Sequence, residues 1–310
     1  MELMSGNEAI AQGAWEAGCT IGVAYPGTPS TETLEAFANK EGVYAEWCVN
    51  EKVAVEVGIG ASAAGARVLA TMKHVGVNVA ADPLFTAAYT GVGGGMVILA
   101  ADDPGMYSSQ NEQDSHYYAQ AAAIPCLDPA DSAEALRFTR EAYDISERFD
   151  VPVIIRSSVR ISHTKTPVEA GERAEAPARP YEKNPAKWVM MPAFAKPRRL
   201  VQLDRIDKLR QWVETCPYNE VIEGKDTVGV ARGRGAPGRE HLQARGHLAP
   251  SRGRPARFRR FRRSRVRRGG GLGVPQRRRA GLRGAGERYA VPSAAGRRAV
   301  AGARARGLRP

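Results

Sequence analysis

Side chains that can exchange protons or bind polar groups follow apolar segments along this chain of 310 residues. Thr28, Glu51, Lys73 with His74, and Asp102 each stand at or just beyond the end of such a segment. A carboxylate, an amine and an imidazole are groups that serve in general acid–base catalysis, and a hydroxyl can bind a polar substrate. Whether they act together depends on the elements that position them.

Glu51 begins a segment of small, mostly apolar residues, 51–65, which predicts a helix with Asn50 as its cap. Because this segment is apolar on nearly all sides, we expect the helix to be buried and Glu51 to lie at the edge of a packed core. A glutamate at a helix start also complements the helix dipole, and this purely structural role is the alternative.

Strand-like segments alternate with helical patterns over the first 160 residues, which is typical of a parallel α/β sheet. We therefore predict an α/β fold with an open parallel sheet and helices on both faces. The expected strands cover residues 19–25, 43–49, 67–72, 96–101, 124–127 and 151–157. Ligands of such sheets bind beyond the carboxyl ends of the strands. The loops expected to gather at that edge are 26–30, 50–51, 73–76 and 102–105.

Local signals place the helix ends. Gly6 and Asn7 are expected to cap the first helix, and Ser30 the second. A helix is expected over 77–89, with Asp82-Pro83 in its interior or at a break. Further helices are expected over 31–40, 116–123, 129–149 and 205–215.

Each polar loop also has an interpretation without chemistry. Lys73 and His74 could be a solvated pair, and residues 108–111 are either a hydrated loop or a set of substrate donors. The glycines within 91–95 precede a strand, which is the wrong order for a phosphate site, so we interpret them as a turn. The motifs of dinucleotide sites, P-loops, zinc proteases and serine hydrolases are absent from residues 1–230.

The charge is divided unevenly along the chain. Residues 231–310 contain 24 Arg, two Glu and neither Lys nor Asp, so they carry +22, whereas residues 1–230 carry −10. Arg, Gly, Ala and Pro dominate this tail and share GC-rich codons, so we interpret it as out-of-frame translation from about residue 230. Nucleic-acid binding by the arginines is the competing interpretation, and either way we expect disorder.

The four cysteines are widely spaced, and the sequence has neither a signal peptide nor an apolar run long enough to span a membrane. We expect a reduced, cytoplasmic protein without a membrane partner. The domain division that we predict is 1–163 for the parallel sheet, 164–197 for an extended linker, 198–230 for the start of a second α/β domain, and 231–310 for the tail.

Several sequence words carry a specific resemblance, collinear over about residues 3–230. They are 6–11 (GNEAIA), 25–30 (YPGTPS), 49–54 (VNEKVA), 72–84 (MKHVGVNVAADPL), 101–105 (ADDPG) and 108–114 (SSQNEQD). These words resemble the alpha subunits of indolepyruvate:ferredoxin oxidoreductases, which are thiamine-diphosphate-dependent 2-oxoacid:ferredoxin oxidoreductases.

The resemblance implies that residues 1–163 bind the pyrimidine end of thiamine diphosphate. Glu51 matches the glutamate that hydrogen-bonds N1′ of the aminopyrimidine, which makes Glu51 the expected catalytic residue. A carboxyl group there favours the imino tautomer, whose nitrogen takes the C2 proton of the thiazolium. The aryl pyruvate then loses carbon dioxide, electrons pass to ferredoxin, and coenzyme A takes the acyl group.

The resemblance also implies further contacts at this edge. Residues expected near the cofactor, besides Glu51, are Tyr25, Pro26, Thr28, Lys73 and His74. Residues expected near the substrate are Thr28, Lys73, His74, Asp102, Ser109, Gln110 and Asn111. Lys73 and His74 would bind the substrate carboxylate or the tetrahedral intermediate. A metal ligand is not expected in this chain.

Alpha subunits of this family continue with another α/β domain, a diphosphate-binding domain that holds Mg²⁺, and a segment with [4Fe-4S] clusters. This sequence lacks their motifs, so we expect a fragment that is inactive alone. The implied partners are a beta subunit, a second alpha subunit and ferredoxin. The alternatives are another 2-oxoacid specificity, or a non-catalytic module whose basic tail binds nucleic acid.

Overall fold

The computed structural model describes residues 1–177 and 179–219. The expectations for the tail at 231–310, and for the end of the segment 198–230, lie outside these residues. Within the described part, no helix is both long enough and apolar enough to cross a membrane.

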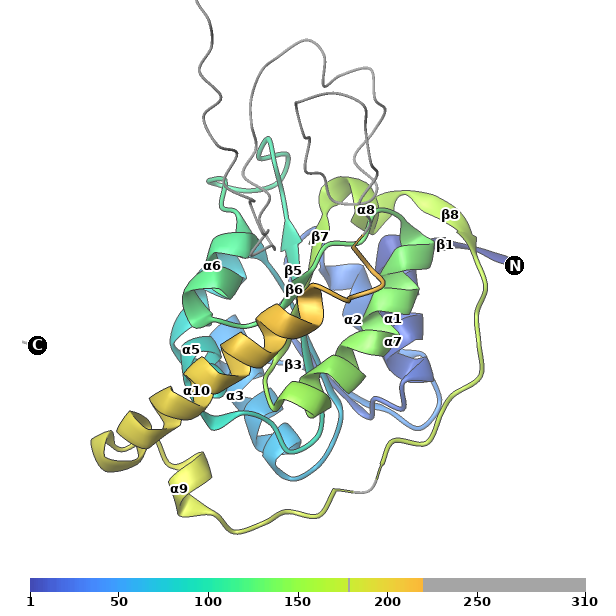
Figure 1. Cartoon of the computed structure of the whole chain (residues 1–310). Coiled ribbons are helices and arrows are strands. Elements are labelled where there is room, and N and C mark those ends of the chain that lie inside the picture. The colour runs from blue at the N-terminus through green and yellow to red at the C-terminus, as the bar shows by residue number, and fades with distance from the viewer. Residues whose placement is uncertain (178, 220–310) are drawn as a thin grey trace, which may run out of the picture. The chain divides into compact units, whose positions relative to one another are not determined.

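A six-stranded parallel sheet forms the centre (Figure 1). Its strand order is β3-β2-β4-β5-β7-β6. The strands are β2 (Ile21–Ala24), β3 (Tyr44–Trp47), β4 (Val68–Lys73), β5 (Met96–Asp102), β6 (Cys126–Leu127) and β7 (Val153–Ser158). Both β4 and β5 are buried along their whole length, as expected for strands covered on two faces. The predicted parallel sheet is confirmed.

Helices cover both faces of the sheet, as predicted (Figure 1). One group packs α1 (Gly6–Glu16) against α2 (Thr31–Ala38) and α7 (Ser132–Phe149). The other group contains α3 (Glu51–Ala63), α4 (His74–Val79), α5 (Ala81–Thr90) and α6 (Ser115–Ala122). The helix expected over 77–89 is thus two helices, with the break just before Asp82-Pro83.

Ser30 is the N-cap residue of α2 as expected, whereas the expected cap of α1 is wrong. Ser5, rather than Gly6 or Asn7, caps α1, because its hydroxyl accepts from the amide of Glu8. Asn7 is buried and instead donates to the carbonyl of Pro29 at 2.8 Å, which fixes the loop after β2. Ser30 precedes α2 without a side-chain cap bond, since its hydroxyl donates to the carbonyl of Gly27.

Helix α3 is less buried than its composition predicts. Asn50 caps it as expected by accepting from the amide of Val53 at 2.9 Å. One face, including Ala54 and Val55, is buried, whereas Val57 on the opposite face is 39% exposed. The prediction of burial on all sides is therefore wrong, because only one face of the helix meets the sheet.

The predicted linker over 164–197 contains regular structure at both ends. After α8 (Val159–His163), β8 (Lys165–Val168) pairs antiparallel with β1 (Glu2–Ser5) in a two-stranded ribbon. Near the other end, α9 (Pro185–Trp188) precedes α10 (Pro192–Val213). An uninterrupted linker was expected because the proline-rich composition hides both a strand that pairs with distant residues and a helix that begins at a proline.

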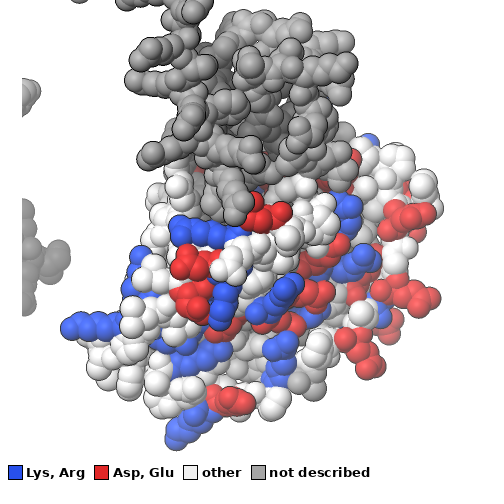
Figure 2. All heavy atoms as spheres, in the orientation of Figure 1, with Lys and Arg blue, Asp and Glu red and all other residues white. Residues whose placement is uncertain are grey.

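Helix α10 packs against α5 and α7 rather than starting a separate body within the described residues. Leu209 joins the main hydrophobic core, and Trp212 contacts the ring of Phe149 at a centroid distance of 5.6 Å. Its outer side carries charges of both signs, interspersed over α10 and α7 (Figure 2).

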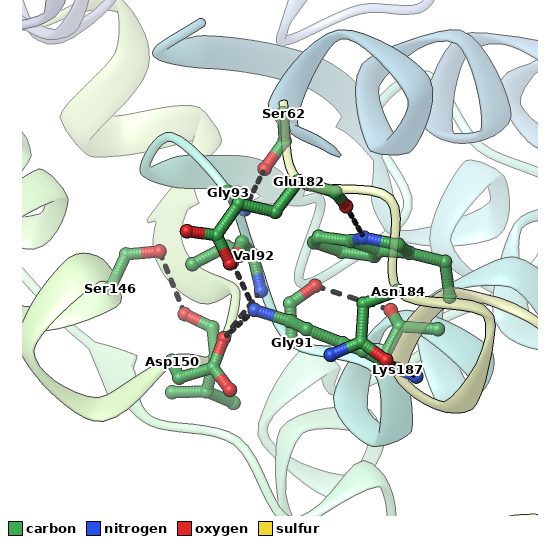
Figure 3. Close-up of polar contacts among 12 residues, drawn as sticks. Ser62, Gly91, Val92, Gly93, Ser146, Asp150, Glu182, Asn184 and Lys187 are labelled. Carbon is green, nitrogen blue, oxygen red and sulfur yellow. Dashed lines mark hydrogen bonds and ion pairs between the residues drawn. The ribbon is translucent and has the colours of Figure 1, made fainter. Parts of the chain in front are cut away.

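Asp150, which ends α7, ties this region to the amino ends of the strands. Its carboxylate accepts from the amide of Val92 at 2.9 Å and from Lys187 Nζ of α9 at 3.0 Å (Figure 3). Arg205 and Arg198 of α10 also pair with it. One carboxylate therefore joins the turn before β5 to two later helices.

Candidate functional site

The strand order of the sheet reverses between β2 and β4, which makes this the topological switch point. β3 lies on one side of β2, whereas β4, β5, β7 and β6 lie on the other. The carboxyl ends of the two strands that flank such a reversal splay their loops apart, and ligands of open α/β sheets bind there. Gly27 after β2 and Lys73 at the end of β4 pack against each other at this reversal, because a Cβ on Gly27 would lie 3.0 Å from Lys73 Cδ. We call this part of the carboxyl edge, between the loops after β2 and β4, the crevice.

Glu51 reaches the same region from the first turn of α3. Its side chain packs over Gly76 of α4, where a Cβ would come within 2.6 Å of Glu51 Oε1. Glu51 is 8% exposed, and within the described part of the chain its carboxylate has neither an ion-pair partner nor a hydrogen bond. A buried carboxylate in this state has acceptor capacity left for a bound donor.

Lys73 and His74 are also buried, and neutral carbonyl groups hold them. Lys73 Nζ donates to the carbonyl of Ser108 at 3.0 Å. His74 Nε2 lies 2.9 Å from the carbonyl of Asn111, and since a carbonyl can only accept, Nε2 carries a hydrogen. Among residues 1–177 and 179–219, neither side chain has a carboxylate partner, and His74 Nδ1 has no hydrogen-bond partner.

Asp103 organises the loop that supplies these two carbonyl groups. Its carboxylate accepts from the amides of Tyr107 at 3.1 Å and Ser108 at 2.8 Å, and from the hydroxyl of Ser109 at 2.6 Å. These hydrogen bonds outweigh the opposing effect of burial and lower the pKa of Asp103. The loop 104–111 is thus built around one buried carboxylate.

Asp102, its neighbour, points into a different network. Its carboxylate accepts from Ser115 Oγ and from Arg156 Nε, at 2.5 Å and 2.7 Å, and it is 1% exposed. Arg156 also pairs with Asp114 and Asp128, and His116 lies between those two carboxylates. Asp102 therefore belongs to a cluster of paired charges at the carboxyl ends of β5, β6 and β7. Its oxygens already accept hydrogen bonds from protein donors.

The remaining predicted residues lie around the crevice. Tyr25, Pro26 and Thr28 are exposed in the loop after β2, and Gln110 and Asn111 are exposed in the loop after β5. Ser108 Oγ lies 3.5 Å from the carbonyl of Thr28, which brings these two loops together. The structure thus gathers Glu51, Lys73 and His74 with the loop of Thr28, whereas Asp102 and Ser109 are occupied by structural hydrogen bonds.

The sequence patterns did not single out Asp103, Gly27 or Gly76. Asp103 had a signal, since it stands next to Asp102 at a strand end, but neighbours on a strand point to opposite faces and composition does not tell which faces the site. The two glycines matter because Lys73 and Glu51 pack on them. Close packing of this kind has no local sequence signal beyond the glycine itself.

This chain is similar to a family model and to curated proteins of known name. The family model described as "Pyruvate flavodoxin/ferredoxin oxidoreductase, thiamine diP-bdg" matches residues 12–211. Indolepyruvate oxidoreductase subunit IorA of Archaeoglobus fulgidus is 45% identical over 234 residues, which is 73% of this chain and 38% of that protein. IorA of Thermococcus kodakarensis is 43% identical over 80% of this chain and 39% of its own length.

More distant similarities extend this pattern. The 2-oxoglutarate synthase subunit KorA of Archaeoglobus fulgidus is 31% identical over 54% of this chain and 51% of its own length. A solved structure of 2-oxoglutarate:ferredoxin oxidoreductase from Magnetococcus marinus matches with a TM-score of 0.58 at 18% identity, covering 72% of this chain and 47% of that one. This last match supports the fold alone. The chain spans about two fifths of the IorA relatives.

Proposed function

Because the chain belongs to the pyruvate flavodoxin/ferredoxin oxidoreductase family of thiamine-diphosphate-binding domains, we propose that it binds the aminopyrimidine end of thiamine diphosphate through Glu51. The complete enzyme would oxidatively decarboxylate an aryl pyruvate such as indolepyruvate, form the aryl-acetyl-CoA and reduce ferredoxin. The buried carboxylate of Glu51 at the crevice carries this proposal.

The residues present fit the group. Glu51 is 8% exposed, and its oxygen lies over Gly76, where a larger residue would collide with it. A flat heteroaromatic ring can come close to the carboxylate only where no side chain fills the space, as at Gly76. A ring nitrogen that exchanges a proton needs a buried carboxyl partner. In the described part of the chain no cation neutralises Glu51, so the carboxyl group is available to such a nitrogen.

Thiamine diphosphate, when bound, supplies the carbon nucleophile and the electron sink for decarboxylation. Glu51 would hold or release a proton at the aminopyrimidine nitrogen. The Lys73 ammonium has hydrogens beyond the one donated to Ser108, and these would bind the substrate carboxylate. His74, held through Nε2, would present Nδ1 as the second polar group of the pocket.

The proposed substrate class rests on the higher sequence identity to the IorA relatives than to the KorA relative. The IorA relatives are 42–45% identical over about three quarters of this chain, whereas the KorA relative is 31% identical over 54%. The words around Glu51, Lys73 and His74 also match the indolepyruvate branch. A different 2-oxoacid on the same scaffold is the alternative, and a comparison of kcat/KM for indolepyruvate and 2-oxoglutarate would separate the two.

We assign the other functions of the enzyme to parts of the complex outside the described residues. These are the diphosphate and Mg²⁺ site, the [4Fe-4S] clusters, and the contacts with coenzyme A, ferredoxin, a beta subunit and a second alpha subunit. On this proposal the 310-residue chain alone neither turns over nor binds the cofactor tightly. Calorimetry that gave a Kd below about 1 μM for thiamine diphosphate would contradict this division.

The test of the mechanism is Glu51→Gln in the complete enzyme with its partner subunit. We expect indolepyruvate-dependent ferredoxin reduction to fall by about 100-fold or more, because the carboxyl proton is lost while the shape is kept. Glu56→Gln on the same helix is the control, since Glu56 is exposed and paired with Lys52. Full turnover by Glu51→Gln would exclude the role assigned to Glu51.

A further inference from the structure

Ser108 is a junction between three loops of the crevice. Its amide and hydroxyl donate to Asp103 Oδ2, at 2.8 Å and 3.3 Å, while its carbonyl accepts from Lys73 Nζ at 3.0 Å. Its hydroxyl also lies 3.5 Å from the carbonyl of Thr28. The position of the Lys73 ammonium is therefore tied to the carboxylate of Asp103 through a single residue.

The rest of loop 104–111 depends on the same carboxylate. Tyr107 and Ser109 donate to Asp103, and residues 104–108 are otherwise exposed to solvent. Three residues further on, the carbonyl of Asn111 meets His74 Nε2 at 2.9 Å. The amide of Gly105 also donates to Glu112 Oε2 at 2.9 Å, but Asp103 is the buried acceptor that holds residues 107–109. We expect this part of the loop to lose its conformation when that acceptor is removed.

Asp103 itself is too deep to meet a substrate directly. It is 1% exposed, and both of its oxygens accept from loop donors. Its partners are all neutral amides and hydroxyls, so it adds negative charge near Lys73 without neutralising it by contact. A residue of this kind acts on the site through the groups that it orients.

We propose that Asp103 is a positioning residue, which fixes loop 104–111 so that the carbonyl groups of Ser108 and Asn111 hold Lys73 and His74 in place. The role of Lys73 in substrate binding rests on the proposed function. The hydrogen-bonded arrangement of Asp103, Ser108 and Lys73 is independent of that proposal.

The first test measures lysine reactivity in the 310-residue chain, without cofactor. A brief pulse of an amine-acylating reagent, read by mass spectrometry, reports how well each lysine is held. In Asp103→Ala we expect Lys73 to be acylated on the order of 10-fold faster than in the unmodified chain. Lys187, which is tied to Asp150 at the other end of the sheet, should not change.

A reciprocal variant and a conservative one make this test selective. Asp150→Ala should raise the acylation of Lys187 and leave Lys73 unchanged. Asp103→Asn keeps one acceptor oxygen, so its effect on Lys73 should be intermediate. Equal acceleration of both lysines in Asp103→Ala would show general unfolding, and no acceleration of Lys73 would show that Asp103 does not position it. Either result overturns the proposal.

The second test uses the complete enzyme and separates this inference from the proposed function. In Asp103→Asn we expect KM for the 2-oxoacid to rise by about 10-fold while kcat changes less, because ground-state binding by Lys73 is weakened. A fall in kcat at unchanged KM would contradict the link to substrate binding. If the Glu51 role fails but the lysine result holds, only the proposed function is lost.

Discussion

Buried charges at the two ends of the parallel strands have different surroundings. At the amino ends, the Arg67 guanidinium meets Glu147 at 2.8 Å and Asp144 at 3.0 Å, and Asp150 meets three cations. In the crevice at the carboxyl ends, Glu51 lacks an ion-pair partner within the described residues, and the hydrogen bonds that the Lys73 and His74 side chains form there go to carbonyl groups. Among the described residues, the charges at the amino ends are thus paired and Glu51 and Lys73 are not.

The difference agrees with the proposed ligand site at the carboxyl ends. A buried charge without a partner lowers stability, and such charges cluster at functional sites. The other half of the carboxyl edge supports this interpretation, because Asp102 there is fully paired with Ser115 and Arg156. Pairing thus separates structural from candidate functional residues more sharply than burial does.

Breaking a pair at the amino ends should have the largest effect on stability. Arg67→Met leaves Glu147 and Asp144 without this partner, and Arg67 is only 7% exposed. We expect the free energy of unfolding to fall by about 3–5 kcal/mol in denaturant titrations. Arg210→Met, which removes an exposed pair with Asp207, is the matched control and should cost less than about 1 kcal/mol. Equal effects would remove the distinction between the regions.

The paired half of the carboxyl edge should show a pH-dependent contribution of intermediate size. Burial lowers the pKa of His116, but the hydrogen bonds to Asp128 and Asp114, which outweigh burial and the Arg156 charge, raise it. A raised folded-state pKa gives stabilisation that is complete below the ordinary value near 6.5 and is lost as the pH rises through the folded value.

His116→Gln should therefore destabilise the chain by about 1 kcal/mol at pH 5.5 and by less at pH 9. The pKa values of Asp114 and Asp128 are lowered, mainly by His116 and Arg156 against the effect of burial, so their contribution persists above the ordinary value of 3.8. Thermal unfolding of the unmodified chain and of His116→Gln at about pH 5.5 and pH 9 measures the difference in stability. A penalty that grows with pH would have the wrong sign for this cluster.

Removing an unpaired charge from the crevice should have the smallest effect on stability. Lys73→Met keeps the stem that packs on Gly27 and loses only the ammonium. Glu51→Gln keeps the shape of the side chain. We expect each substitution to change the free energy of unfolding by less than about 1 kcal/mol. A small increase or a small decrease agrees with the contrast between paired and unpaired charges. A loss as large as that of Arg67→Met would mean that Glu51 or Lys73 is structural.

Much of the fold was predictable because its signals are local. The apolar segments at 67–72 and 96–101 became β4 and β5 with ends shifted by at most one residue, since fully buried parallel strands are continuous apolar runs. Asn50 capped α3 as expected, because capping needs only neighbouring residues. The gathering of the polar loops at one edge followed from the parallel direction of the strands.

The parts that were missed depend on distant contacts. The sequence shows an arginine at position 67 but not that Glu147 lies beside it, and β8 is a strand only because β1 pairs with it. For the site, the choice between Asp102 and Asp103 depended on where β5 ends, because Asp102 is its last residue and Asp103 lies just beyond it, and strand ends are rarely predictable to one residue. Residue types alone therefore identified the edge but not all of its members.

The β1–β8 ribbon has a consequence for the order in which the chain folds. Glu2 pairs with Val168, and the six strands of the parallel sheet lie between β1 and β8 in the sequence, so β1 cannot pair until all six have been made. Contacts between such distant residues require more chain entropy to be lost than local ones do. We therefore expect β2 to β7 to assemble before the ribbon closes, and Met4 to enter the core only with that final step. Residues of β1 are then among the last of the described segment to become folded.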